Sequence, residues 1–296
     1  MLRRLKKLID HPGFRAEPLT MSGRSLAWAA HVARGASPVF PLTASGGEKM
    51  RVPSDLRYTS VSCYVLRDWC EPELRHLDQL VRPGSVFIDI GANIGLFTLK
   101  AARLTGPQGR VIAIEPGTEA ANRLEENVGL NSYAQVTILR QALSDSNGEA
   151  VLHHVQLGND PQAYSLVGSA LATDGETVKT ETLDSLVSRL ALTQIDCIKM
   201  DVEGAEPMVI AGAAQTLDRF HPMVIFEINT TLIAKGTQGA GANDAAWQML
   251  KAHGYGFRRF RDGSPVPVDS VGSEFGNLLA VHPDGPSPVG PQDMGR

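Results

Sequence analysis

Residues 86–95 read Val-Phe-Ile-Asp-Ile-Gly-Ala-Asn-Ile-Gly, and they decide the fold class of this 296-residue chain. The first five residues are a short apolar run, typical of a strand that is buried on both faces. The glycines that follow permit a tight turn and a close approach of the backbone to a ligand. Apolar residues then recur at helical spacing from Ile94 to Leu104. A strand, a glycine loop and a helix in this order predict a phosphate or nucleoside site at the start of the helix.

The same alternation continues toward the C-terminus. Strand-like runs over 111–115 and 136–139 flank a helical pattern over 118–131. This βαβαβ order predicts a parallel sheet with right-handed crossovers. Further elements are expected as strands over 195–200 and 223–228, a helix after Glu206-Pro207, a helix over 243–253, and an antiparallel pair over 255–260 and 277–281.

The remaining segments predict additions to this sheet. Residues 149–155 and 176–183 are strand-like and predict an inserted hairpin or flap, and a helix is expected over about 71–80. Residues 11–60 are punctuated by proline and glycine and predict short, irregular elements. Proline and glycine supply seven of the last fourteen residues, which predicts a disordered tail. We therefore expect an N-terminal extension over 1–64 that serves as a candidate substrate lid, a ligand-binding domain over 65–282, and a tail over 283–296.

Composition and charge exclude several classes of protein. With 43% hydrophobic and 20% charged residues, the chain is globular rather than disordered. The net charge of −4 argues against a nucleic-acid partner that is held through its phosphates. No apolar run approaches the roughly 20 residues of a membrane helix. The three cysteines are odd in number and lack zinc-site spacing, so we expect reduced thiols in a cytoplasmic protein.

The first ten residues, MLRRLKKLID, are basic but lack the apolar stretch of a signal peptide. Their leucines fall on one helical face, which allows a weak peripheral contact with an anionic membrane surface. A solvated N-terminal helix is the simpler interpretation. The sequence leaves the oligomeric state open.

The residues around the glycine loop favour a cationic ligand over a dinucleotide. A dinucleotide loop reads G-x-G-x-x-G, and Asn93 stands where its second glycine would be. Asp89 precedes Gly91 and would repel a pyrophosphate. S-adenosylmethionine carries a sulfonium and an ammonium group, so a nearby carboxylate helps to bind it. We therefore expect S-adenosylmethionine rather than NAD, with Asp89, Gly91, Ala92, Asn93 and Gly95 as cofactor-binding residues.

Two further strand ends are expected to contact this cofactor. Glu115 lies twenty residues beyond Gly95, at the end of the second strand, where a carboxylate can accept bonds from both ribose hydroxyls. Pro116 follows it. The third strand ends before Gln141-Ala142-Leu143-Ser144, and in an open parallel sheet this edge would contact the adenine. We expect Gln141, Ala142 and Ser144 to bind it, with a plain turn as the alternative.

Six motifs in order resemble the FkbM-type methyltransferases: FIDIGANIG from Phe87, VIAIEP from Val111, QALSD from Gln141, TLDSL from Thr182, IDCIKMDVEGAE from Ile195 and VIFEIN from Val224. The resemblance covers about residues 65–230. It implies a class I S-adenosylmethionine-dependent methyltransferase fold: an α/β, Rossmann-like, doubly wound sheet that is mostly parallel with an antiparallel edge strand.

The resemblance also implies a function and a further contact. Members of this family usually methylate a hydroxyl on a sugar, polyketide or similar metabolite. Trp69-Cys70-Glu71-Pro72 resembles the family's short acidic segment, which implies a cofactor contact for Glu71. Pro207 departs from the expected pattern, but an early helical position tolerates proline.

Methyl transfer to an alcohol needs a base to take the hydroxyl proton or a metal to lower its pKa. Asp201 lies at the carboxyl end of a strand, where doubly wound sheets bind ligands, so we expect it to be catalytic or to anchor the cofactor. Glu203 and Glu227 are the next catalytic candidates. Helix-start or salt-bridge roles are the alternative for each carboxylate.

Other chemistries stay open. A divalent metal such as Mg²⁺ on Asp201 and Glu203 fits oxygen-ligand preferences but is not favoured, because such pairs are common without metal. His153, His154 and His221 are alternative bases. A non-catalytic nucleoside-binding module and an NAD-dependent oxidoreductase remain as alternative functions.

Overall fold

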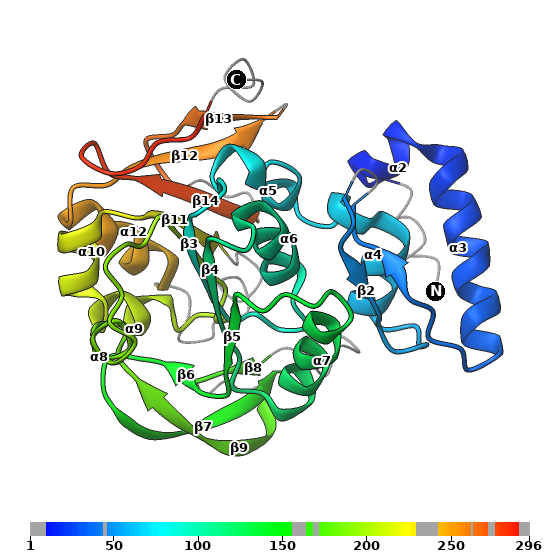
Figure 1. The fold of residues 1–296 in the computed structure, drawn as a ribbon, viewed down its shortest axis with the longest axis horizontal. Helices are drawn as coiled ribbons and strands as arrows, with labels where there is room; N and C mark the ends of the chain where they lie inside the picture. Colours follow the sequence, from blue (N-terminus) through cyan, green and yellow to red (C-terminus); the bar gives the residue numbers. More distant parts are fainter. Residues whose placement is uncertain are drawn as a thin grey trace.

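The computed structural model describes residues 10–43, 46–155, 164–167, 172–228, 242–261, 263–271 and 276–289. Within them, the centre is an eight-stranded sheet in the order β13-β12-β14-β11-β10-β3-β4-β5 (Figure 1). Neighbouring strands from β11 to β5 pair in parallel, and those from β11 to β13 pair antiparallel. The strand bounds are β3 (Val86–Ile90), β4 (Arg110–Ile114), β5 (Val136–Leu139), β10 (Cys197–Met200), β11 (Met223–Ile228), β12 (Gly256–Arg261), β13 (Ser264–Pro267) and β14 (Gly276–Val281).

Helices cover both faces of this sheet, as expected for a doubly wound fold (Figure 1). One face packs on α8 (Leu183–Arg189), α9 (Glu206–Ala211), α10 (Ala214–Phe220) and α12 (Ala242–Ala252). The other face carries α6 (Leu96–Thr105) and α7 (Thr118–Gly129). The two sets of core side chains alternate along each strand, as in Phe87 and Ile88. The α/β architecture predicted from the sequence is confirmed.

The alternation also places a set of polar residues on the α6 face. Asp89 lies two residues after Phe87 in β3 and therefore faces the same side of the sheet. Lys199 has the same relation to Cys197 in β10. Register pairs Asp89 with Lys199, and Glu227 with Asn277. These side chains therefore extend the buried α6 face toward the carboxyl ends of β3, β10 and β11.

The N-terminal region is more regular than predicted. It contains α2 (Pro12–Ala16), α3 (Pro18–Ala33), the short strands β1 (Phe40–Pro41) and β2 (Lys49–Met50), and α4 (Tyr58–Leu66). The prediction of short, irregular elements over 11–60 is wrong for the 16-residue helix α3. Only Met21 and Trp28 of this helix are fully buried, so its sequence lacks the strong apolar stripe that would have predicted it. The expected boundary at residue 64 falls inside α4.

The helix predicted over 71–80 is broken in two. The structure has α5 (Pro72–Arg75) and the 3₁₀ turn η2 (Leu77–Gln79), which are separated at His76. Leu74, Leu77 and Leu80 are buried as the apolar pattern predicted. A 3₁₀ turn also brings residues three apart to one face, so the pattern did not distinguish the two conformations.

The inserted hairpin is confirmed. Strands β7 (Gly148–Val155) and β9 (Ala172–Glu181) pair antiparallel. With β6 (Ala142–Leu143) and β8 (Tyr164–Ser165) they form a second sheet at the lower edge of Figure 1. Strand β9 ends at Glu181, before the predicted 183, because the Thr182 side chain accepts a bond from Ser185 N and caps α8.

The antiparallel pair at the sheet's edge is also confirmed as β12 and β14, and β13 adds a further edge strand. The sequence did not predict β13 because this strand contains Pro265 and Pro267, and proline is found in strands only at the edge of a sheet. Residues 283–289 of the predicted disordered tail are described, and Val289 N donates to Gln79 O at 2.8 Å. The rest of that tail and the predicted helix over 1–9 lie outside the described residues.

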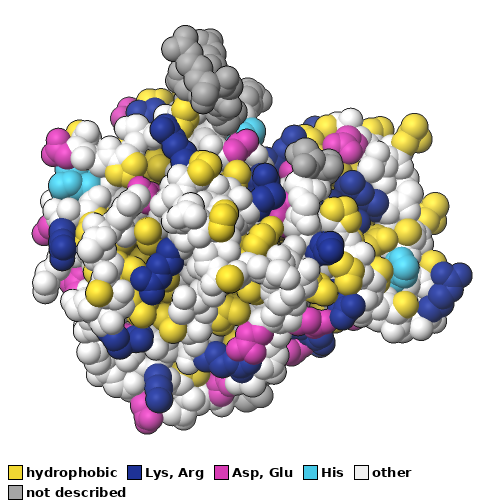
Figure 2. Space-filling view, in the orientation of Figure 1, with side chains coloured by type: hydrophobic (Ala, Val, Ile, Leu, Met, Phe, Trp, Pro, Cys, Tyr) yellow, Lys and Arg dark blue, Asp and Glu magenta, His cyan; other side chains and the backbone are white. Residues whose placement is uncertain are grey.

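The surface combines both signs of charge. On the face shown in Figure 2, basic and acidic side chains are interspersed, without a large patch of one sign. On α3, Leu19 and Leu26 are exposed. Among the residues that the structure describes, none of the helices combines the length and apolar character needed to span a bilayer.

Candidate active site

The loop between β3 and α6 is held close to two neighbouring strands. Gly91 N and Ala92 N both donate to Ile114 O, at 2.9 and 3.0 Å. Gly91 has a φ of 77°, and a Cβ there would lie 1.9 Å from Asp201 O. The position therefore requires glycine for both its conformation and its lack of a side chain.

Two hydrogen bonds from backbone N–H groups fix the Glu115 side chain beside this loop. Its Oε2 accepts from Asn93 N at 2.7 Å, and its Oε1 accepts from Gly117 N at 2.8 Å. The side chain is buried, and burial raises its pKa to about 7. A carboxylate has about four acceptor sites, so each oxygen keeps capacity for a ligand hydroxyl.

A first cavity, which we call the β4 pocket, opens at this glutamate. It is bounded by the ends of β3 and β4, by the second sheet, and by the loop after β10. Its lining residues are Ile90, Gly91, Asn93, Ile114, Glu115, Pro116, Ala142, Leu143, Leu152, Ser165, Leu166, Asp201, Val202 and Glu203. The pocket thus joins a polar rim with an apolar wall.

A second cavity, which we call the α4 pocket, lies on the other side of the loop. It is lined by Tyr58, Thr59, Ser62, Cys63, Cys70, Glu71, Asp89, Gly91, Ala92, Asn93, Ile94, Leu96, Phe97, Lys199 and Asp201. The two pockets share Gly91, Asn93 and Asp201. Together they form one bipartite site over the glycine loop.

Lys199 stands at the centre of the charged groups in the α4 pocket. It is 1% exposed, and its Nζ donates to Asn277 Oδ1 at 2.9 Å and contacts Asp201 Oδ2 at 3.3 Å. Burial by itself lowers the pKa of Lys199, but the carboxylates around it, Asp201 and Glu71 above all, raise it above its ordinary value. Lys199 is therefore a fixed positive charge among carboxylates.

Two carboxyls of the α4 pocket, Asp89 and Glu71, have a raised pKa. Asp89 is 2% exposed and accepts from Thr98 Oγ1 at 2.5 Å, and burial raises its pKa to about 6. Burial raises the pKa of Glu71 to about 8, although Lys199 opposes this shift. Asn277 Nδ2 donates to Glu71 Oε2 at 3.3 Å and to Glu73 Oε2 at 3.0 Å. Perturbed carboxyls in a cleft are typical of functional sites.

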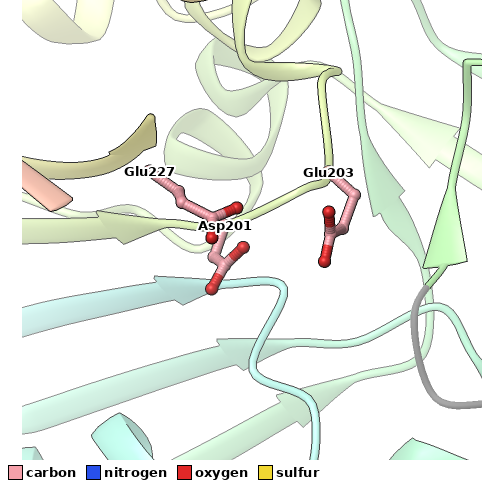
Figure 3. Close-up of side chains that lie close together, drawn as sticks. All are labelled: Asp201, Glu203 and Glu227. Carbon is pink, nitrogen blue, oxygen red and sulfur yellow. The ribbon is translucent and has the colours of Figure 1, made fainter. Parts of the chain in front are cut away.

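Three carboxylates meet where β10 and β11 end (Figure 3). Asp201, Glu203 and Glu227 each offer an oxygen, and these oxygens lie within 4.8 Å of one another. Asp201 borders both pockets, Glu203 borders the β4 pocket, and Glu227 reaches in from the neighbouring strand. The structure therefore brings together the three residues that the sequence predicted as catalytic.

Most of the predicted cofactor-binding residues line these pockets, but three do not. Gly95 is the N-cap of α6 with a φ of 101°, and it shapes the turn while packing near Leu124. Gln141 donates its amide to Glu181 Oε2 at 2.6 Å and borders a separate groove. Ser144 is buried against Gly212. Of the predicted adenine edge, Ala142 lines the β4 pocket together with Leu143.

The histidines are poor candidates for the base. His221 lies just before β11, at the end of the strand opposite to the carboxylates, and it stacks on His282 at 3.9 Å. His153 lies in β7 and pairs with Ser165, but it does not line either pocket. The side chain of His154 lies outside the described residues.

Two groups of residues that line the site were not predicted from the sequence. The first is the face of α4 with Tyr58, Ser62 and Cys63, and the second is the contribution of Ser165 and Leu166 from the inserted segment. Ser165 Oγ donates to Glu203 O at 2.8 Å, which ties this segment to the carboxylate loop. No local pattern marks these residues, because they reach the site only through tertiary packing.

A family model for the methyltransferase FkbM domain matches residues 89–257, more than half of the chain. The chain belongs to the FkbM methyltransferase family. This match confirms the resemblance seen in the six motifs. The matched residues run from the end of β3 to the start of β12, and they include the glycine loop, Glu115 and all three clustered carboxylates. The family consists of S-adenosylmethionine-dependent methyltransferases.

The individual relatives share about a third of their residues with this chain, over about half of its length. The 2-O-methyltransferase NoeI of Sinorhizobium fredii is 33% identical over 153 residues, which are 47% of this chain and 62% of NoeI. The hexuronic acid methyltransferase AglP of Haloferax volcanii is 30% identical over 158 residues, 53% of this chain and 61% of AglP. The matched region thus spans less than two thirds of each of these relatives. A solved methyltransferase FkbM from Methylobacillus flagellatus is 16% identical with a TM-score of 0.44, covering 87% of this chain and 59% of that one.

Proposed function

We propose that this FkbM protein is an S-adenosylmethionine-dependent O-methyltransferase that acts on a hydroxyl of a sugar or a similar small metabolite. The observation that carries the proposal is the bipartite site, in which the β4 and α4 pockets meet at Gly91. A Cβ at Gly91 would meet Asp201 O, so glycine is needed there for the loop to lie against the end of β10, where the two pockets meet.

The residues of both pockets fit the proposed cofactor. In the β4 pocket, Glu115 would hold the ribose hydroxyls, and the apolar wall with Leu143 and Leu166 would enclose the adenine. In the α4 pocket, Asp89 and Glu71 would face the cationic methionine part. S-adenosylmethionine supplies an electrophilic methyl group when bound. The carboxyl-rich setting disfavours NAD, whose pyrophosphate it would repel.

The acceptor belongs beside Asp201, because this residue borders both pockets. Its carboxylate and those of Glu203 and Glu227 would orient the acceptor hydroxyl and draw off its proton. Lys199, in contact with Asp201, keeps part of this negative charge balanced. NoeI, a 2-O-methyltransferase, supports transfer to oxygen, and AglP, a hexuronic acid methyltransferase, supports a sugar acid or a similar sugar as the acceptor class.

The N-terminal extension, residues 1–64, is proposed to form the outer wall of the acceptor side. Tyr58, Thr59 and Ser62 of α4 line the α4 pocket, which Asp201 also lines. This placement supports a role in acceptor choice. We further propose a cytoplasmic location and a small-molecule substrate, with no nucleic-acid partner.

Isothermal titration of the full chain with S-adenosylhomocysteine and with NAD tests the cofactor. We expect saturable binding of the first and none of the second, and the reverse would overturn the proposal. A methyl-transfer screen against nucleotide sugars and cell extracts, read by mass shift, then tests the acceptor. Transfer to nitrogen or carbon acceptors alone would contradict O-methylation.

A further inference from the structure

We propose that Asp201, Glu203 and Glu227 form a binding site for one hard divalent cation, of the Mg²⁺ or Mn²⁺ class, beside the acceptor position. The three carboxylates come from the end of β10, the loop after it, and β11 (Figure 3). Their oxygens lie within 4.8 Å of one another. Carboxylate oxygens are the ligands that these cations prefer.

A second observation points to a ligand at this place. The Oε2 atom of Glu227 is closed off from solvent and accepts no hydrogen bond from the part of the chain that the structure describes. A buried carboxylate oxygen without a donor is costly, and native proteins rarely leave one unsatisfied. Its neighbours in the cluster are two further carboxylates, which cannot donate when ionised. A cation between them satisfies this oxygen.

An octahedral ion determines how close the three carboxylate oxygens must come. With metal–oxygen bonds of about 2.1 Å, adjacent ligand oxygens lie about 3.0 Å apart. The three oxygens lie within 4.8 Å of one another, so side-chain rotations would have to bring them closer for all three to bind one ion. Three carboxylates would fill one side of the octahedron. The other positions would face the pocket that Asp201 and Glu203 line, where water or an acceptor hydroxyl can enter.

The local charge also favours a divalent ion. When all three carboxylates are ionised they carry a charge of −3, and Lys199 compensates one unit through its contact with Asp201. A divalent cation would bring the net charge of these four side chains to zero, whereas a monovalent cation would not. Glu227 lines neither pocket, so the cation site extends the cofactor site toward β11 rather than repeating it.

The role of the ion rests on the proposed function, whereas its binding does not. At this position it would coordinate the acceptor hydroxyl and lower its pKa. Sugars present neighbouring hydroxyls that can chelate a hard cation, so the site would favour acceptors with vicinal oxygens.

Titration of the full chain with Mn²⁺ alone, followed by the electron paramagnetic resonance signal of the free ion, tests the site. We expect saturable binding of one ion per chain that Mg²⁺ displaces. Glu227→Gln and Asp201→Asn should each weaken Mn²⁺ binding at least tenfold, and the exposed Glu149→Gln should leave it unchanged. Absence of saturable binding, or binding that both variants leave intact, would overturn the proposal.

The same preparations separate this inference from the proposed function. S-adenosylhomocysteine binding by calorimetry without Mn²⁺ binding would sink the cation site and leave the methyltransferase proposal standing. Mn²⁺ binding without S-adenosylhomocysteine binding would do the opposite. Circular dichroism melts establish that each variant is folded, and Glu227→Gln should fold because it removes a buried charge while keeping the shape of the side chain.

Discussion

Individual residues of this site work against the stability of the fold. Asp89 and Lys199 lie on a buried face of the central sheet, at positions where the strands otherwise carry Phe87 and Cys197. Burying charged groups costs stability even when they are paired. Such a cost at the carboxyl ends of parallel strands is expected where a ligand, rather than the fold, requires the charge.

The Asp89 carboxyl provides a test of this cost. Its pKa is about 6 in the folded chain against an ordinary value of 3.8, because it is buried. The unfolded chain therefore loses this proton first as the pH rises from about 4 to 6, and native stability falls over that window. Asp89→Asn should raise the free energy of unfolding by about 1–3 kcal/mol at pH 8 and by less at pH 5.

Urea unfolding at the two pH values measures this difference. Asp145→Asn, at an exposed site, is the matched control and should change stability little at either pH. Equal gains at pH 5 and pH 8, or a loss at pH 8, would show that the Asp89 charge is not the cause. The same Asp89→Asn variant should bind S-adenosylhomocysteine more weakly.

Glu115 permits a second test at the residue scale. Both of its oxygens accept backbone bonds and would share a ribose in the proposed complex. Glu115→Gln replaces one acceptor by a donor that faces a backbone N–H. We expect the dissociation constant of S-adenosylhomocysteine to rise about 10- to 100-fold, since bonds to charged groups contribute about 1.5–3 kcal/mol. Calorimetry checks this, with Glu149→Gln as the control, and an affinity within twofold of the parent would refute the assignment.

At the scale of elements, the sequence predicted what local patterns encode. The β3 strand, its glycine loop and α6 were predictable because apolar runs, glycines and helical spacing all lie within residues 86–105. Asp201 and Glu227 were predictable as neighbours because they end adjacent parallel strands. Helix α3 was not, since only Met21 and Trp28 mark its buried face. Gln141 and Ser144 do not line the pockets, since Gln141 binds Glu181 and Ser144 is buried, and no local pattern indicates either contact.

The glycine loop makes the sharpest prediction at this scale. Gly91→Ala would place a Cβ against the Asp201 carbonyl at a positive φ, so the loop or the end of β10 must move. We expect a loss of several kcal/mol in the free energy of unfolding and no measurable cofactor binding. Thermal melts and calorimetry measure both.

Gly129→Ala is the matched control for this substitution. Gly129 ends α7 with no atom near its Cβ position, and alanine there should keep or slightly raise stability. If Gly91→Ala bound the cofactor as the parent chain does, the close approach of the loop to Asp201 would not matter for the site.

At the scale of the whole molecule, the N-terminal region and the sheet share one core. Met21, Trp28 and Phe40 belong to the same buried cluster as Phe87 and Ile225 of the central sheet. The region that lines the acceptor side of the site is thus part of the same core as the sheet. A lid that closed as a separate body would have to break this cluster.

A substitution in α3 distinguishes a shared core from a separate lid. Trp28 is 2% exposed, packs on Tyr64 and donates to Asp55 O at 2.9 Å, so Trp28→Ala should cost about 3–5 kcal/mol. Leu26→Ala on the same helix should cost little, because Leu26 is 75% exposed. With one core, far-UV circular dichroism and the fluorescence of Trp69 and Trp247 shift together in urea. If Trp28→Ala instead unfolded α3 and α4 in a separate early transition, with the FkbM domain still binding S-adenosylhomocysteine, the N-terminal region would be an independent lid, and acceptor choice would be governed by its closure.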